Sequence, residues 1–172
     1  MPEGISNFTK LETLNLRNSS LNILSEEIGS LIQLKVLNLE GTKITALPQS
    51  IVKLTQLTEL NLEKTNISSL PKNIGNLKKI KVLSFEKTKI ETVPTSINEL
   101  INLKELNLQN IPTLKELPDL SNLKNLETLY LTLYENENTS KIKESLKILE
   151  KKLPNCFISL EDEKGKMIFL QD

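Results

Sequence analysis

Acidic side chains recur at a fixed spacing in this sequence and are its first candidates for chemistry. Glu40, Glu63 and Glu86 lie 23 residues apart, and Glu59 and Glu105 belong to the same pattern. A row of carboxylates on one surface attracts basic partners, whereas carboxylate oxygens in a close-spaced loop bind Ca²⁺. No such loop accompanies this row, and the EDEKGK segment has neither the length nor the spacing of an EF-hand. The pattern therefore favours a basic partner, and we expect no metal site.

The inventory of nucleophiles and bases excludes the common forms of catalysis. The chain of 172 residues contains no His and one Cys. Without histidine it has no Ser-His-Asp or Cys-His unit, and a single cysteine forms neither an intrachain disulfide nor a thiolate zinc site. None of the five glycines lies in a GxGxxG or GxxxxGK phosphate-binding pattern. We expect a non-enzymatic chain that needs no cofactor.

Charge balance and hydropathy exclude two further classes of partner. Lys and Arg total 22, equal to the total of Asp and Glu, and Arg17 is the single arginine. Nucleic-acid binders usually show a basic excess and arginine forks, so we expect no nucleic-acid partner. No apolar run approaches the roughly 18 residues of a membrane-spanning helix, and the N-terminus does not resemble a signal peptide. The chain is expected to be soluble, and its location stays unknown because an upstream segment would allow secretion or display at the cell surface.

A repeat of 23 residues organises most of the chain. Six segments begin with Leu or Ile and share the pattern LxxLxLxxTxIxxLPxxIxxLxx. The alternation within LxL predicts a short strand with one buried face, and the proline of the LP pair ends any regular ladder. One repeat cannot bury its own leucines, so the stacking of successive repeats must create the core. The segments begin at Leu11, Leu34, Leu57, Ile80, Leu103 and Leu126, and the prolines are Pro48, Pro71, Pro94 and Pro118.

In this pattern the sequence resembles the leucine-rich repeat family. The resemblance implies an α/β solenoid, a curved horseshoe with a parallel β-sheet on its concave face and an irregular or 3-10 convex side. The spacing after the LP pair is similar to a short bacterial subclass with 23-residue repeats, including those of leptospires, and also to plant intracellular relatives. The family usually has Asn or Cys where Thr42, Thr65, Thr88 and Ser19 stand here. We expect these hydroxyls to bond the loop backbone inside the coil, with a ligand-facing role as the alternative.

The N-terminal end of the repeat array is expected to be open. Pro2, Ile5 and Phe8 occupy the proline, isoleucine and leucine positions of a preceding half repeat, and no amphipathic cap covers them. An open end exposes apolar surface and unpaired strand groups, so we expect further repeats or a domain upstream, or packing against a second copy. The expected units are a half repeat at 1–10, five full repeats at 11–125, a last strand at 126–134 and a C-terminal cap at 135–172.

The C-terminal residues predict a helix and a hairpin. Thr139 or Ser140 can cap a helix over about 141–152. Two strands at 156–160 and 167–170 would then form a hairpin around EDEKGK that extends and closes the sheet. Before this cap, the return path of the fifth repeat is expected to differ locally because its leucine spacing shifts by one residue. The apolar stripe of the helix consists of Ile142, Leu146, Leu149 and Leu153.

The residues between the strand leucines are expected to line the concave face. Successive parallel strands lie about 4.8 Å apart, so equivalent positions form columns across the sheet. The first column is Thr13, Val36, Glu59, Val82, Glu105 and Thr128; the second is Asn15, Asn38, Asn61, Ser84, Asn107 and Tyr130; the third is Arg17, Glu40, Glu63, Glu86, Gln109 and Thr132.

These columns supply the candidate partner-binding residues. Tyr130 replaces a repeated Asn and is the expected anchor, because tyrosine is enriched at interaction hot spots, whereas Tyr134 is expected to pack on the cap. Alternatively, Lys64 and Lys87 neutralise the glutamates and the face is simply solvated. The candidates are Arg17, Glu40, Glu59, Glu63, Glu86, Glu105, Gln109 and Tyr130.

The family resemblance implies a recognition scaffold, since its members mostly bind other proteins. We therefore expect a non-enzymatic module that binds a basic protein or peptide on its concave face. One alternative is a structural or assembly domain that self-associates into a homo-oligomer through the open N-terminal edge. A second alternative is the recognition domain of a larger effector or receptor. Any catalytic activity would then lie outside this chain, and a host molecule is among the expected partners.

Overall fold

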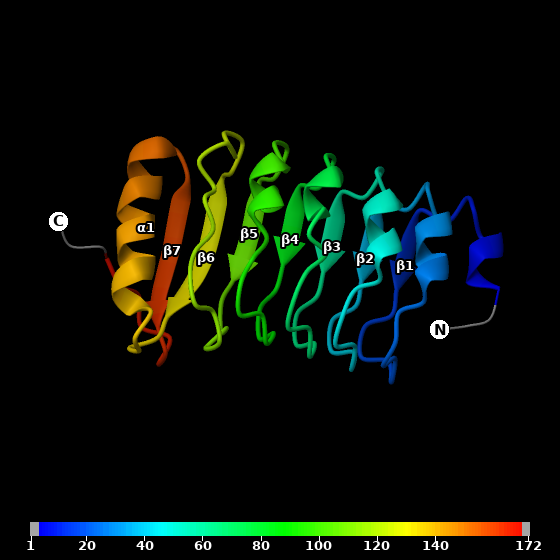
Figure 1. Cartoon of the computed structure of the whole chain (residues 1–172), viewed down its shortest axis with the longest axis horizontal. Coiled ribbons are helices and arrows are strands. Elements are labelled where there is room, and N and C mark those ends of the chain that lie inside the picture. The colour runs from blue at the N-terminus through cyan, green and yellow to red at the C-terminus, as the bar shows by residue number, and fades with distance from the viewer. Residues whose placement is uncertain (1–3, 170–172) are drawn as a thin grey trace.

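Within residues 4–169, seven short strands form one parallel sheet that runs along the molecule (Figure 1). The structure is a computed structural model that describes residues 4–169. Each strand pairs with the next in sequence order, and paired residues such as Leu37 and Leu60 lie one repeat apart, which confirms the predicted register. The strands are β1 (Thr13–Asn15), β2 (Val36–Asn38), β3 (Glu59–Asn61), β4 (Val82–Ser84), β5 (Glu105–Leu108), β6 (Thr128–Leu133) and β7 (Phe157–Asp162).

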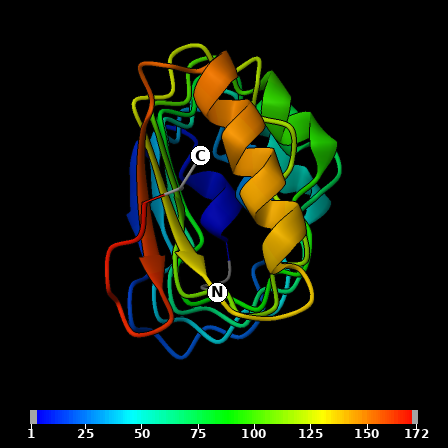
Figure 2. The same ribbon diagram turned by 90° about the vertical axis from the view of Figure 1, so that its left-hand side faces the viewer.

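Short 3-10 helices form the convex side opposite the sheet, as predicted (Figure 2). Prolines fix the entry to two of them, because Pro48 and Pro94 stand at the residue before the helix, where a missing N–H costs nothing. Between β5 and β6 the described chain turns without a helix, in agreement with the shifted leucine spacing of the fifth repeat. The 3-10 helices are η1 (Ile5–Asn7), η2 (Glu26–Ser30), η3 (Gln49–Lys53), η4 (Ile74–Asn76) and η5 (Thr95–Glu99).

Two pairs of neighbouring convex turns, η2 with η3 and η4 with η5, are in close contact through glycine and serine. A Cβ atom on Gly29 would lie 2.5 Å from the Cβ of Ser50, and one on Gly75 would lie 2.3 Å from the carbonyl oxygen of Ser96. The serine hydroxyls tie neighbouring turns together, since Ser50 donates to the carbonyl of Glu26 at 2.7 Å. Glycine is therefore required at these two positions by the close approach of the next coil.

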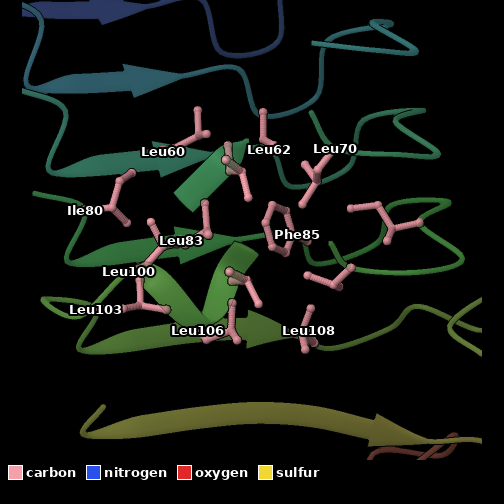
Figure 3. Close-up of a cluster of buried hydrophobic side chains, with 14 of the residues drawn as sticks. Leu60, Leu62, Leu70, Ile80, Leu83, Phe85, Leu100, Leu103, Leu106 and Leu108 are labelled. Carbon is pink, nitrogen blue, oxygen red and sulfur yellow. The ribbon is translucent and has the colours of Figure 1, made fainter. Parts of the chain in front are cut away.

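Aliphatic side chains from successive repeats stack into one continuous core (Figure 3). Leu60 and Leu83 are 0% and 1% exposed, and Phe85 fills a leucine position with complete burial. Full burial of such a side chain stabilises the fold by roughly 1.5–3 kcal/mol, so stacking of the coils is the main source of stability.

The threonines that replace the family's usual Asn have the structural role predicted for them. Thr42 and Thr65 each donate an Oγ1 hydrogen bond of 2.7 Å to the carbonyl of the leucine that directly follows the strand, and Thr88 makes the same bond at 2.8 Å to Phe85. Ser19 departs from this prediction, because its buried Oγ has no hydrogen-bond partner in the part of the chain that the structure describes. The hydroxyl network therefore begins with the second repeat.

The C-terminal cap contains one α-helix, α1 (Thr139–Lys152). Its predicted apolar stripe is confirmed, because each of its four residues is at most 6% exposed. The predicted start and cap are wrong: the helix begins at Thr139 and its N-cap residue is Asn138, which makes no side-chain cap bond. The Thr139 hydroxyl serves the preceding loop instead, accepting from the N–H of Asn136 at 2.8 Å and donating to the carbonyl of Tyr134 at 2.6 Å.

The predicted hairpin is only partly formed. β7 extends the sheet in parallel to β6, and a turn with Gly165 at φ 78° leads to a single antiparallel bridge between Glu161 and Met167. The sheet is therefore open and not closed as expected, because one bridge does not make a strand that covers the edge of β7. Leu170, the end of the predicted second strand, and Pro2 lie outside the described residues.

The first coil leaves apolar surface at the N-terminal edge of the sheet. Leu14 and Leu16 are only partly buried, whereas their counterparts Leu37 and Leu39 are fully buried by the preceding coil. Phe8 is 58% exposed at the end of η1. This edge therefore exposes more of its strand leucines than the next coil does.

Candidate concave binding face

Parallel pairing brings every second strand residue onto the concave face, in the columns that the repeat predicts. Strand leucines such as Leu60 point into the core, so the neighbours Glu59 and Asn61 point to the opposite face. β7 adds Phe157 to the first column and Ser159 to the second. Phe157 is 62% exposed and was missed as a face residue, although alignment of β7 with the preceding strands would have revealed its position.

The asparagines of the second column lie at or next to the last residue of their strands. The Oδ1 atom of Asn38 accepts a hydrogen bond of 2.9 Å from the N–H of Glu40, two residues later, and Asn61 and Asn107 make the same bond. Such Asx bonds favour a turn, while backbone hydrogen bonds between coils continue beyond the asparagines, as from the N–H of Leu39 to the carbonyl of Asn61 at 2.9 Å. Ser84 lacks the amide, and its hydroxyl donates instead to the carboxylate of Glu63 at 2.8 Å.

The corner after each early strand adopts a left-handed backbone conformation. Asn18, Gly41 and Asn110, at φ 55°, 68° and 57°, are residue types that tolerate it, whereas Lys64 and Lys87 occupy it at φ 55° and 57°. A long side chain there costs roughly 1 kcal/mol of backbone strain. The same conformation sets both lysine side chains beside the glutamates of the third column.

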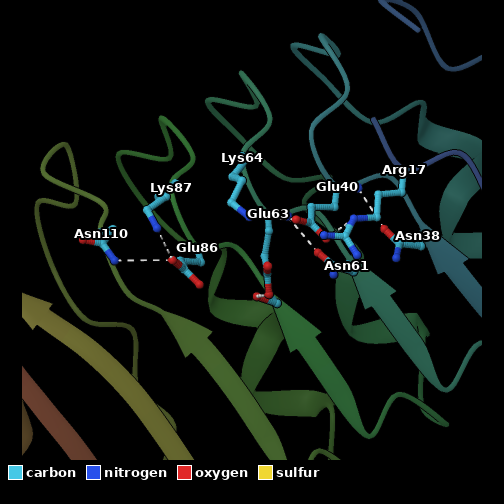
Figure 4. A network of polar contacts seen from close by, with 10 residues as sticks. Arg17, Asn38, Glu40, Asn61, Glu63, Lys64, Glu86, Lys87 and Asn110 are labelled. Carbon is cyan, nitrogen blue, oxygen red and sulfur yellow. Dashed lines mark hydrogen bonds and ion pairs between the residues drawn. The ribbon is translucent and has the colours of Figure 1, made fainter. Parts of the chain in front are cut away.

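Glu40 lies buried between two cations (Figure 4). Its carboxylate is 2.8 Å from Nζ of Lys64 and 3.1 Å from Nε of Arg17, while the whole residue is only 5% exposed. The hydrogen bond from Lys64 lowers the pKa of Glu40 below its ordinary value, against the opposing effect of burial, and the charges of Lys64 and Arg17 lower it further. The pKa of Lys64 is raised by the same pair. Arg17 and Glu40 therefore already satisfy each other.

Glu86 is neutralised in a similar way. Its carboxylate is 2.7 Å from Nζ of Lys87 and accepts a weaker bond of 3.4 Å from Nδ2 of Asn110. For Glu40 and Glu86, the structure thus has the arrangement in which Lys64 and Lys87 neutralise the row of glutamates.

The remaining concave carboxylates have no ion pair within residues 4–169. Glu59 and Glu105 lie half-buried in the first column, and the carboxylate of Glu63 accepts a hydrogen bond from the hydroxyl of Ser84. Glu161 on β7 accepts a hydrogen bond of 2.8 Å from Thr132. Glu59, Glu63 and Glu105 therefore carry carboxylates without an ion pair in the described part of the chain, two of them in the first column.

Aromatic side chains gather at the C-terminal end of this face. Tyr130 on β6 is half-buried and lies diagonally across the sheet from Phe157 on β7, within reach of long side chains. Tyr134 is half-buried just after β6, and burial, followed by the nearby charges of Glu161 and Glu163, raises its pKa. The structure thus brings the predicted anchor Tyr130 together with an aromatic residue that the repeat did not indicate.

Other surfaces offer less organised chemistry. A hollow of about 1060 Å³ lies between α1 and β7, and its lining mixes apolar residues with both signs of charge. In the described part of the chain, no three His, Cys, Asp or Glu side chains are arranged to hold a metal ion. None of the helices formed by residues 4–169 is both long and apolar enough to cross a membrane.

Comparison with known proteins yields one family and several similar structures. A family model described as a leucine-rich repeat region matches residues 2–63 and 57–167. A leucine-rich repeat protein of Leptospira interrogans has a TM-score of 0.81 and 36% identity, over 92% of this chain and 39% of that one. The plant peptide hormone receptor RGFR1, in complex with RGF2, has a TM-score of 0.71 and 27% identity, over 88% of this chain and 24% of that one.

A third similar structure, the functional domain of InlJ from Listeria monocytogenes, has a TM-score of 0.72 at 22% identity, over 98% of this chain and 33% of that one. At this identity the likeness concerns the fold alone. No curated protein sequence matches the chain. The chain spans about two fifths of the Leptospira protein and about a quarter of the plant receptor.

Proposed function

The chain belongs to the leucine-rich repeat family, and on this premise we propose that it binds a protein or peptide partner on the concave face of its sheet. One observation carries the proposal: Glu59, Glu63 and Glu105 face outward in fixed register without an ion-pair partner in the described structure, and Tyr130 and Phe157 lie at the C-terminal end of the same face. The likeness to a peptide hormone receptor solved in complex with RGF2 supports the same type of function.

The proposed partner is basic, because the charge left unbalanced on this face is negative. Glu59, Glu63 and Glu105 are its direct contacts, with Gln109 beside them and Tyr130 as the anchor. The other sequence candidates, Arg17, Glu40 and Glu86, have a supporting role, since they are held in internal ion pairs. In a longer protein the same face would supply recognition, while any enzymatic activity would lie elsewhere.

Charge reversal on the face tests this proposal. A library of displayed random peptides is selected on the protein, and the affinity of the selected peptides is then measured for the double variant Glu59→Lys/Glu105→Lys. We expect a loss of at least about tenfold, since each reversal replaces attraction by repulsion. The matched control is Glu144→Lys/Glu150→Lys on the exposed side of α1. Selected peptides that bind both double variants like the wild type would refute the proposal.

The anchor residue has a separate test. Tyr130→Ala should weaken the selected peptides by about tenfold or more, as expected for a tyrosine hot spot. Its half-buried position leaves the leucines of β6 in place, so thermal unfolding should stay close to that of the wild type. Unchanged affinity in a folded Tyr130→Ala variant would remove Tyr130 from the proposed interface.

Self-association is a second candidate function, favoured by the partly exposed leucines of the first coil. Leu14, Leu16 and the exposed Phe8 form an apolar edge, and a second copy would cover them. Light scattering after size exclusion should then give a mass that rises with concentration, and Phe8→Glu should abolish the rise. A monomer mass over the whole concentration range would contradict this candidate.

A further inference from the structure

The first concave column alternates between apolar and acidic residues. Pairing in β2 to β5 places Val36, Glu59, Val82 and Glu105 side by side, one on each strand. Neighbouring strands lie about 4.8 Å apart, so Glu59 and Glu105 are separated by two strand spacings, about 9.6 Å, with Val82 between them. The backbone positions of Glu59 and Glu105 therefore lie about 9.6 Å apart across the face.

That distance selects one backbone conformation for a bound peptide. A polyproline-II helix has three residues per turn and rises 3.1 Å per residue, so side chains three residues apart share one face at about 9.3 Å. An extended strand brings side chains to one face every two residues, at about 6.6 Å or 13 Å, which misses one carboxylate. An α-helix returns to the same face after seven residues, which rise about 10.5 Å. This rise exceeds the spacing of the two glutamates, and side chains on a concave face converge, which makes the mismatch larger.

The same step continues to the aromatic end of the face. Phe157 lies two strands beyond Glu105 in the first column, with Thr128 between them, and Tyr130 is its diagonal neighbour. A third side chain of a polyproline-II segment, three residues beyond the second, would therefore lie on the exposed ring of Phe157. Apolar and proline side chains pack well on such aromatic surfaces.

Three lysines directly precede β2, β4 and β5, and two of them are paired internally, whereas Lys81 before β4 has no ion pair among residues 4–169. Lys35 and Lys104, which directly precede β2 and β5, are held in ion pairs by Glu12 and Glu127. Glu59 and Glu105 have no ion-pair partner in the described structure. The track thus combines two carboxylates, an apolar spacer and an aromatic end in one line across the strands.

We propose that the concave face binds a polyproline-II segment with two basic side chains three residues apart, on Glu59 and Glu105, and an apolar side chain three residues further on Phe157. This inference rests on the proposed function and specifies its ligand. The segment runs across the strands, and its backbone makes no strand ladder with the sheet.

Peptides of one composition and different spacing test the inference. The probes are fluorescein-labelled LPPKPPKPPL, LPPPKPKPPL and LPPKPPPKPL, whose lysines lie three, two and four residues apart, with binding measured by fluorescence anisotropy. The first peptide should bind about fivefold more tightly than the other two, since it alone forms both ion pairs. Glu59→Gln and Glu105→Gln should each abolish this preference, and the control Glu150→Gln on α1 should retain it.

Each contrary result has a distinct meaning. Equal affinity for the three peptides, a preference that survives Glu105→Gln, or tighter binding of a helical peptide with lysines seven residues apart would overturn the polyproline-II inference. If peptides from the random library need Glu59, Glu105 or Tyr130 but carry no basic pair at this spacing, the inference fails and the proposed function stands. If they need none of these residues, the proposed function fails as well.

Discussion

Replacement of Gly75 by alanine should separate two convex turns that are now in direct contact. A Cβ atom at this position would lie 2.3 Å from the carbonyl oxygen of Ser96 and 2.9 Å from the Cβ of Glu99. Non-bonded heavy atoms pack at about 3.5 Å, so η4 and η5 would have to move apart by about 1 Å. Backbone atoms form the tightest of these contacts, and a change of rotamer cannot relieve it.

The cost follows from two opposing effects. Overpacking of a well-packed site costs about 1–3 kcal/mol, and a backbone obstacle places Gly75→Ala in the upper half of that range. Alanine also reduces the conformational freedom of the unfolded chain, which offsets about 0.5–1 kcal/mol. We therefore expect the free energy of unfolding to fall by about 2 kcal/mol.

Urea denaturation followed by circular dichroism measures this change. Gly165→Ala is the control, because a Cβ atom there meets nothing within 4 Å and only the positive φ of 78° opposes it, at about 1 kcal/mol. If Gly75→Ala lowered the free energy of unfolding by less than about 0.5 kcal/mol, the close contact between the convex turns would play no part in stability and the reasoning would be refuted.

Three other substitutions probe the concave corners and the hydroxyl network. Lys87→Asn should raise the free energy of unfolding by about 0.5 kcal/mol in urea titrations, because asparagine tolerates φ 57° better and the lost ion pair with Glu86 is exposed. Glu40→Gln should lower it by about 1–3 kcal/mol at pH 7. The pKa of Glu40 is lowered in the folded state, so the difference in free energy of unfolding between wild type and variant should be complete above the ordinary pKa of 4.5. It should vanish as the pH falls through the folded pKa. A difference that persists at pH 2 would contradict this account. Thr65→Val should cost about 1 kcal/mol by removing its bond to the Leu62 carbonyl, and a neutral effect in thermal unfolding would assign the position to packing alone.

The repeat made the core and the register predictable. Leu60 and Leu83 recur at a fixed period because each must enter the same buried row, so a count along the sequence is enough to pair β3 with β4. The convex turns were predictable for the same reason, since the prolines and isoleucines recur with the strands. Buried residues must recur at a fixed spacing, and that spacing is visible in the sequence alone.

The charge state of the concave face was less predictable. The sequence offered two readings of Glu40 and Glu86, and the choice between them depended on the left-handed corner that turns Lys64 and Lys87 toward the carboxylates. Phe157 escaped detection because β7 lies outside the period and follows a helix. These features depend on local backbone geometry and on side-chain rotamers, which the repeat does not encode.

Glycine against serine on the convex side, and valine beside glutamate on the concave side, both recur at every second coil. The repeating unit of these contacts is therefore a pair of coils, and a change in length by a pair preserves them. Removal of one coil, residues 57–79, would set Ser96 against Val52, where no glycine makes room. Removal of a pair, residues 34–79, would set Ser96 against Gly29 and keep both alternations intact. The contacts of Gly29 with Ser50 and of Gly75 with Ser96 therefore favour a change of length by two coils over a change by one.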